Sequence, residues 1–118
     1  MATQLDIEPK RKRAAGAPCA CSPVAPTIDD AAAQRLVTVA NALADPVRVR
    51  LVDVLRDHPG KLCPCELVGL FELSQPTISH HLKVLKDANI LESEKHGLFV
   101  YYYVRPGALD ELTSWLTH

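Results

Sequence analysis

The stretch LSQPTISHHLKVLKDANIL, residues 73–91, carries the pattern that decides the fold. Ser74 is placed to cap a helix, because a serine hydroxyl accepts a hydrogen bond from the free amides of a first turn. Ile78, Leu82 and Leu85 recur at i, i+4 and i+7, which places them on one buried face. The opposite face is polar and neutral to basic. The stretch therefore predicts an amphipathic helix that reaches about residue 88 and exposes one polar side.

A short apolar segment directly precedes this helix. Residues 64–71 are predicted to form a helix with Leu67, Leu70 and Phe71 turned inward. Only the three residues ELS, 72–74, separate the two helices. Two helices joined by so brief a turn indicate a helix-turn-helix.

The flanking segments extend this pattern in both directions. Residues 29–43 predict an amphipathic helix, and Asp45, as an N-cap before a first-turn proline, begins another that ends near residue 58. The segment ILESEKHGLFVYYYV, residues 90–104, alternates around His-Gly and predicts a β-hairpin. A last helix is expected over about residues 106–117. The fold class is mostly α with a hairpin wing.

The chain composition is that of one compact domain with a tail. The 118 residues are 47% hydrophobic, and residues 1–27 are expected to form a flexible arm before a domain at 28–118. No apolar run approaches a membrane span, so we expect a cytoplasmic protein with no membrane partner and reduced cysteines. The net charge of −1 gives no argument for nucleic acid. The basic run KRKR, residues 10–13, fits a solvated arm, a phosphate contact or a targeting signal.

The polar face of the 75–87 helix offers groups that read DNA bases. Gln75 can pair with the major-groove edge of adenine, and Thr77 and Ser79 can donate, accept or touch a thymine methyl. His80 and Lys83 can reach base acceptors or phosphates. A solvated helix face is the plain alternative, but the order helix, turn, polar-faced helix, hairpin favours DNA reading. His81 lies beside the apolar stripe, so we expect it to pack rather than to bind.

Four cysteines form two Cys-x-Cys pairs, Cys19 with Cys21 in the arm and Cys63 with Cys65 at the start of the 64–71 helix. Residues two apart inside a helix point about 200° away from each other. Pro64, as a first-turn proline, instead makes Cys63 the non-helical N-cap, so the two thiols can converge ahead of the helix. A helix N-terminus favours the thiolate, which binds soft ions rather than magnesium or calcium.

Taken together, the segments ALADPVRVRLVDVL, Cys-x-Cys-Glu-Leu, LSQPTISHHLKVLKDANIL and GLFVYYYV resemble the ArsR/SmtB family of metal-sensing repressors, and within it the arsenic-responsive branch. The resemblance covers roughly residues 33–117. It implies a winged helix-turn-helix, a homodimer, and a repressor that leaves its operator when it binds a toxic metal or metalloid ion.

The resemblance also assigns DNA-contacting residues. On the reading helix these are Ser74, Gln75, Thr77, Ser79, His80 and Lys83, and at the wing tip they are Lys95 and His96. Members of the family often carry arginine in the wing, whereas this chain has none between Arg56 and Arg105. A strong wing contact is therefore not implied.

The identity of the ion depends on the number of sulfurs. Arsenite favours three sulfur ligands, whereas cadmium, lead or zinc accepts four. Enterobacterial arsenic sensors supply a third cysteine from the same helix, where this chain has Val68. The missing sulfur must then come from Cys19 or Cys21, an arrangement also similar to the cadmium and lead sensors. We favour arsenite or antimonite over cadmium or lead, and thiol oxidation is a third trigger.

One further family feature has no counterpart in this chain, and one other function class is an alternative to the repressor. The family's Asp and His site on the last helix has no match in RPGALDEL, residues 105–112. A thiol reductase could use one cysteine pair as nucleophile and resolving thiol. No phosphate-binding loop or acid and base pair accompanies the cysteines, so we expect no enzyme.

Apolar residues of the first and last helices exceed what so small a domain can bury alone. We expect a two-fold dimer through Leu36, Val37, Leu43, Leu109, Leu112, Trp115 and Leu116. Such a dimer would place the reading helices about 34 Å apart, one turn of DNA, so the operator should be an inverted repeat.

Overall fold

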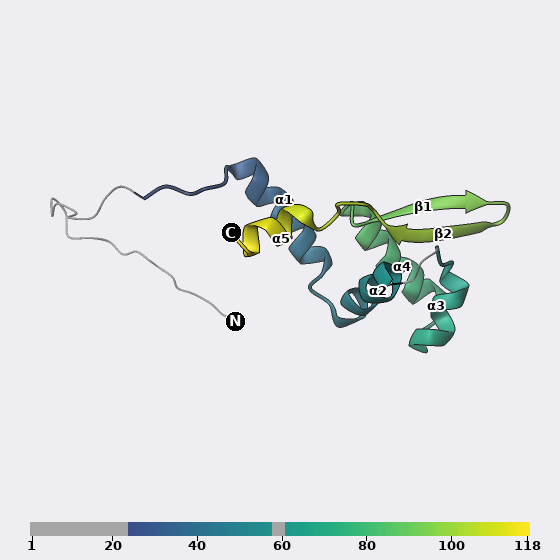
Figure 1. Cartoon of the computed structure of the whole chain (residues 1–118). Helices are drawn as coiled ribbons and strands as arrows, with labels where there is room; N and C mark the ends of the chain where they lie inside the picture. Colours follow the sequence, from purple (N-terminus) through teal and green to yellow (C-terminus); the bar gives the residue numbers. More distant parts are fainter. Residues whose placement is uncertain (1–23, 58–60) are drawn as a thin grey trace.

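The computed structural model describes residues 24–57 and 61–118 (Figure 1). In order, the elements are α1 (Asp30–Ala42), α2 (Pro46–Asp57), α3 (Pro64–Phe71), α4 (Gln75–Asp87), β1 (Leu91–His96), β2 (Phe99–Val104) and α5 (Asp110–Leu116). The strands form a two-stranded antiparallel sheet. The architecture is a winged helix-turn-helix, which confirms the predicted fold class.

The hydrophobic core lies where α2, α3 and α4 meet the start of the hairpin. Its fully buried large side chains are Leu51, Leu67, Ile78, Leu82, Leu85, Ile90 and Leu91. The three stripe residues of α4 are among them, as their spacing predicts. The inward prediction for Leu70 is wrong, because its side chain is 59% exposed. Helix α3 is short, so Leu67 supplies its buried contact while Leu70, three residues later, falls outside.

Side chains fix where the first two helices begin. The Asp29 carboxylate accepts the amide N–H of Ala32 at 2.8 Å, and the Asp45 carboxylate accepts that of Val47 at 2.8 Å. Each satisfies an amide that the first helical turn leaves unpaired. The amide hydrogen bonds at Asp45 also lower the pKa of its carboxyl, although its partial desolvation acts in the opposite direction. The predicted cap of α2 is confirmed.

The hairpin forms in the predicted position, with Leu91 opposite Val104 and His96 opposite Phe99. Gly97 turns the chain with φ of +64°, a conformation that costs glycine little because it has no Cβ. Residue Leu62 pairs with Tyr102 through two backbone hydrogen bonds of 3.1 and 2.7 Å. The segment that enters α3 is therefore fastened to the wing.

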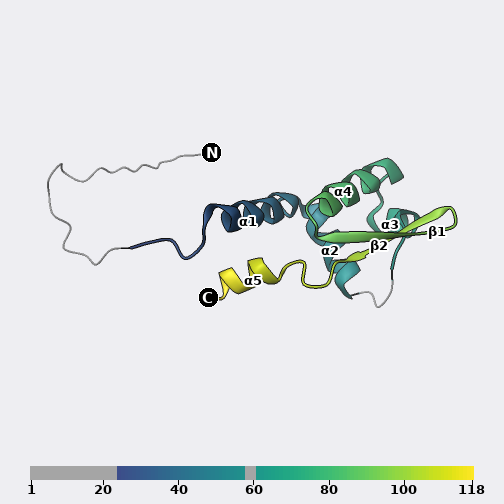
Figure 2. The same ribbon diagram turned by 90° about the horizontal axis from the view of Figure 1, so that it is seen from above.

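Helices α1 and α5 lie side by side at the end of the molecule away from the wing tip (Figures 1 and 2). The Arg35 guanidinium donates to the Glu111 carboxylate at 2.9 Å, which lowers the pKa of that carboxyl. Helix α5 begins at Asp110, so the predicted start near residue 106 is wrong. Residues 106–109 form turns and Gly107 among them has φ of +74°, which delays the helix.

Candidate functional site

Helices α3 and α4 form the helix-turn-helix. Glu72 ends α3 in a left-handed conformation, φ 56°, and its N–H donates to the Val68 carbonyl at 2.9 Å. This reversal of direction lets α4 start at Gln75, and the two helices pack against each other. The short connection predicted from residues 72–74 is confirmed.

The start of α4 is capped by Ser74. Its hydroxyl accepts the amide N–H of Thr77 at 3.4 Å and lies 2.9 Å from the Thr77 hydroxyl. Both hydroxyls thus belong to the cap and remain exposed to solvent. Residue Gln75, at the first helical position, is exposed beside them. The structure gathers these three candidate DNA contacts at one end of α4.

The other candidates spread along α4 and the wing. His80 and Lys83 are exposed and Ser79 is half-buried, and the Lys83 ammonium donates to Asp87 at 3.1 Å. At the wing tip Lys95 and His96 are exposed. The His96 ring lies 3.0 Å from the Glu94 carboxylate, which also holds Lys61 at 2.9 Å.

His81 of α4 packs against Arg48 of α2. The half-buried His81 ring nitrogen Nδ1 lies 3.2 Å from the Arg48 guanidinium, which donates to the Ala42 carbonyl at 2.6 Å. The Arg48 side chain is only 15% exposed and is 3.9 Å from Asp45. The packing role expected for His81 agrees with this geometry, and Arg48 links the end of α1 to α4.

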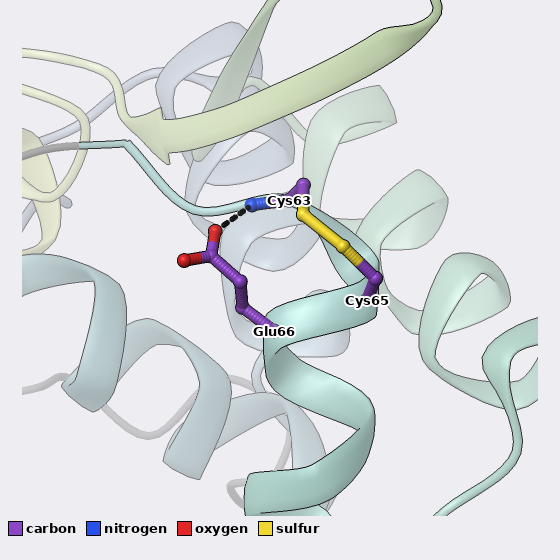
Figure 3. Close-up of a disulfide and its surroundings, with 3 residues drawn as sticks. All are labelled: Cys63, Cys65 and Glu66. Atoms are coloured by element: carbon purple, nitrogen blue, oxygen red, sulfur yellow. Dashed lines mark hydrogen bonds between the residues drawn. A yellow bond between two sulfur atoms is a disulfide. The ribbon is translucent and has the colours of Figure 1, made fainter.

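The cysteine pair lies at the N-terminus of α3. Cys63 has the extended conformation of an N-cap, φ −92° and ψ 160°, and Pro64 follows it, as the sequence predicts. The Cys63 amide donates to the Glu66 carboxylate at 2.9 Å (Figure 3). Cys63 is buried and Cys65 exposed.

The two sulfurs converge as expected, with Cα atoms 5.4 Å apart, but they are joined as a disulfide (Figure 3). The expectation that Cys63 and Cys65 stand reduced therefore differs from the structure. The geometry explains why the bond can form, because the N-cap turn brings both sulfurs to the same side. Any ion that binds here needs the reduced pair.

A pocket of about 400 Å³ opens beside these sulfurs. Its lining residues are Cys63, Pro64, Cys65, Gln75, Ser79, Leu98, Phe99, Val100 and Tyr102. It therefore joins the cysteine pair, the start of α4 and the wing. Two candidate sites that the sequence treats separately, thiols and DNA contacts, share this pocket.

The wing residues of this pocket, Leu98, Phe99, Val100 and Tyr102, are not among the site residues predicted from the sequence. A signal existed in FVYYYV, because period-2 alternation puts Val100, Tyr102 and Val104 on one side of β2. It could not indicate that this side meets α3, since that contact depends on the bridge between Leu62 and Tyr102.

In the part of the chain that the structure describes, no three His, Cys, Asp or Glu side chains gather as a metal site. Cys63 and Cys65 thus have no third ligand there. The other predicted ligands, Cys19 and Cys21, and the basic run at 10–13 lie outside the described residues.

The predicted dimer residues fall into two groups. Leu36 is buried, and Leu43, Leu109 and Leu112 are half-buried. The exposed group is Val37 at 49%, Trp115 at 47% and Leu116 at 65%. Leu109 precedes α5 as its N-cap residue rather than lying within it.

None of the helices in residues 24–57 and 61–118 combines the length and the apolar character that a membrane crossing requires.

Comparison with known proteins gives a consistent picture. The arsenic resistance transcriptional regulator ArsR1 of Pseudomonas putida is 42% identical over 90 residues, covering 67% of this chain and 70% of that protein. A cadmium resistance regulator, the CadC homolog of Staphylococcus aureus, is 42% identical over 64 residues, covering 54% of this chain and 52% of that protein.

The fold comparison agrees. The homodimeric winged helix-turn-helix DNA-binding domain of the Mycobacterium bovis protein Mb0332 superposes with a TM-score of 0.62 at 23% identity, over 80% of this chain and 87% of that one. The matched relatives are transcriptional regulators, a class distinct from thiol reductases. Residues 45–93, which span α2 to the start of β1, match the model described as bacterial regulatory protein, arsR family. The chain belongs to the arsR family of bacterial transcriptional regulators.

Proposed function

We propose that this regulator is a cytoplasmic repressor of arsenic-resistance genes. As a homodimer it binds an inverted-repeat operator in double-stranded DNA. It releases that operator when arsenite or antimonite binds to cysteine thiolates. A flexible arm at 1–27 carries two of those thiolates, and the domain at 28–118 carries the other two and the DNA contacts.

The DNA-binding part of the proposal is supported by the surface of α4. Gln75, Thr77 and His80 are exposed side chains that donate or accept hydrogen bonds. They lie on the same helix as the buried stripe that anchors α4 to the core. Lys83 adds a cation for phosphate, although Asp87 partly neutralises it. The wing adds Lys95 and His96, so a modest wing contact fits this chain.

The single observation that carries the regulatory part is the shared pocket. The sulfurs of Cys63 and Cys65 and the side chains of Gln75 and Ser79 line the same 400 Å³ space. An ion bound to the sulfurs is therefore adjacent to groups that contact DNA. Because two ligands that compete in this way weaken each other equally, operator DNA should also weaken ion binding.

Inorganic arsenite needs a third sulfur, which we assign to Cys19 or Cys21 of the arm. Cadmium or lead is the alternative inducer, and the similarity of this chain to a cadmium resistance regulator supports that alternative. Both kinds of ion are soft and suit thiolates. The number of cysteines required separates them, since cadmium and lead accept four ligands and arsenite three.

A second candidate trigger is thiol oxidation. The observation that favours it is the disulfide between Cys63 and Cys65. In this version the oxidised pair, with no ion, changes the start of α3 and hence the DNA affinity. The proposed fold, dimer and operator stay the same.

The dimer is supported by the exposed apolar side chains of α1 and α5. Val37, Trp115 and Leu116 are each about half or more exposed, and large exposed apolar groups close together mark interaction surfaces. A second copy covers the same surface on both chains in a two-fold dimer. The homodimeric relative of similar fold supports this arrangement.

The test starts by selecting bound DNA from a random-sequence library with the reduced full-length protein. Fluorescence anisotropy then follows release of the selected fragment as arsenite or cadmium is added. We expect release by the wild type, and normal DNA affinity but no release for Cys63→Ser and Cys65→Ser. Gln75→Ala or His80→Ala should weaken DNA binding and leave ion affinity unchanged.

Two results would contradict the proposal. If Cys63→Ser responded to arsenite like the wild type, the site assignment would be wrong. If the reduced protein never released DNA with any ion, but released it on oxidation, the redox trigger would replace the ion. Mass spectrometry of the released protein distinguishes a bound ion from a disulfide.

A further inference from the structure

We propose that a pocket between α1, the end of α4 and the start of α5 binds small organic monocarboxylates. Arg105 would hold the carboxylate, and apolar side chains would cover the hydrocarbon part. This site is separate from the cysteine pair, and it does not depend on the proposed function. The pocket has a volume of about 340 Å³. Sites for small molecules usually measure about 300 to 1,000 Å³, so the ligand of this pocket is small.

The pocket forms where three parts of the chain meet. Thr38 belongs to α1, Asn89 follows the end of α4, and Ala108 lies in the segment that joins β2 to α5. The exposed apolar side chains that we assign to the dimer do not line it. A ligand in this pocket would therefore contact the end of the reading helix together with α1 and α5.

Arg105 provides the group that binds an anion. Its Nε donates to the Asn89 carbonyl at 2.6 Å, which fixes the guanidinium at the end of α4. Within residues 24–57 and 61–118, none of the ion pairs includes Arg105. Its terminal nitrogens Nη1 and Nη2 can therefore donate to a ligand carboxylate, which arginine holds well through two parallel hydrogen bonds.

The charge of the lining favours a ligand with one negative charge. Arg35 also lines the pocket, but the Glu111 carboxylate already accepts from its Nε at 3.0 Å and from its Nη2 at 2.9 Å. Two guanidiniums and one carboxylate give the lining a net charge of +1 (2 − 1 = 1). A single ligand carboxylate neutralises this charge, whereas a cation or a dicarboxylate would leave the site charged.

The rest of the lining favours a ligand with a hydrocarbon part. Leu36, Val39, Ala88 and Leu112 supply its apolar surface. Leu36 and Ala88 are buried, and Val39 and Leu112 are half-buried. A ring or short alkyl chain gains from leaving water against these side chains, whereas an inorganic anion does not. The lining thus fits an aromatic or short aliphatic acid better than phosphate or sulfate.

The experiment uses benzoate, which combines one carboxylate with one ring. NMR follows the amide chemical shifts of the reduced full-length protein while benzoate replaces chloride at constant ionic strength. We expect saturable shifts at Thr38, Asn89, Arg105 and Ala108, with a dissociation constant of about 1 mM, the order expected for a ligand of so few atoms. Benzamide lacks the charge and acetate lacks the ring, so each should bind at least about tenfold more weakly.

Three variants test the role of Arg105. Arg105→Gln should weaken benzoate binding at least about tenfold, because the charge-assisted hydrogen bonds are lost. Arg105→Lys keeps the charge without the planar fork and should bind with intermediate affinity. Lys86→Gln is the matched control, since it removes the same charge from an exposed position in the last turn of α4 that does not line the pocket. It should bind benzoate like the wild type, and circular dichroism shows whether each variant is folded.

Three results would contradict the inference. If benzamide bound as tightly as benzoate, the pocket would not recognise a carboxylate. If Arg105→Gln and Lys86→Gln weakened benzoate equally, the attraction would be general to the protein surface. If the lining amides did not shift, a second copy would cover the pocket and the site would be wrong. If Arg105→Gln did not fold, the comparison of benzoate with benzamide and acetate would decide alone. The ion response is measured separately, so the proposed function stands or falls independently.

Discussion

The two ends of the molecule bury their apolar side chains to different extents. The large, fully buried side chains all come from α2, α3, α4 and the first strand with its preceding residue. In α1 and α5, Val37, Trp115 and Leu116 stay about half or more exposed. A single chain thus supplies a closed core to the helix-turn-helix half, although Leu70, Leu98 and Phe99 remain exposed on its surface. The α1–α5 half is left with apolar surface that we assign to a second copy.

The largest effect is expected in the helix-turn-helix half, whose core lies within one chain. Leu82 is fully buried on the inner face of α4, so Leu82→Ala should lower the free energy of unfolding by about 2 to 5 kcal/mol. Chemical denaturation at two protein concentrations measures this. The loss should be the same at both, since the core lies within one chain. As a control, Lys86→Ala on the exposed side of α4 should change stability little.

A second prediction concerns the exposed half. Trp115→Ala should weaken the dimer by about 2 kcal/mol or more, as expected for an aromatic residue near the centre of an interface. Analytical ultracentrifugation measures the dissociation constant. An exposed tryptophan in a monomer would cost almost nothing, so an unchanged constant would remove α5 from the interface.

The connection between the halves can be tested at Arg48. Arg48→Ala leaves the Ala42 carbonyl and the His81 ring without their partner in a largely buried place, which should cost about 1 to 3 kcal/mol. We expect weaker DNA binding with an unchanged ion affinity, measured by anisotropy. Arg48→Lys should restore only part of the affinity, because lysine cannot contact both groups with a planar fork.

The smallest effect is expected at the Arg35–Glu111 pair. Both side chains are about half exposed, so Glu111→Gln should change the dimer dissociation constant by less than about threefold. Arg35 lowers the pKa of Glu111, so the contribution of this pair is present above the ordinary carboxyl pKa and is lost as the pH falls through the lowered value. When the dimer dissociation constant is measured at decreasing pH below 5, the contribution of this pair should be lost from the wild type and should be absent throughout from Glu111→Gln.

Sequence alone predicts the regular, local features of the structure. The stripe in α4, the caps at Asp45 and Ser74 and the turn at Gly97 follow from spacing and residue type. The inward prediction for Leu70 fails because tertiary packing decides which side of a short helix is buried. The predicted start of α5 is wrong because Gly107 allows turns that the hydrophobic periodicity does not reveal.

The candidate site also has features that the sequence predicts and features that it does not. The N-cap position of Cys63 follows from Pro64, so the convergence of the two sulfurs was predictable. Their disulfide was not predictable, because the spacing of the cysteines carries no information on their redox state. The pocket depends on β2 meeting α3, a long-range contact between segments that a local pattern cannot pair.

The backbone bridge between Leu62 and Tyr102 has a consequence for the order of folding. It joins residues 40 apart in the chain (102 − 62 = 40), and the enclosed loop contains α3, α4 and β1. Closing a loop costs entropy that grows with its length, so we expect the helices and the hairpin to form before the bridge. The cysteine pocket would then be the last part assembled. In native-state hydrogen exchange, the Leu62 amide should exchange earlier than the amides between β1 and β2, so the ligand site would open while the reading helix stays folded.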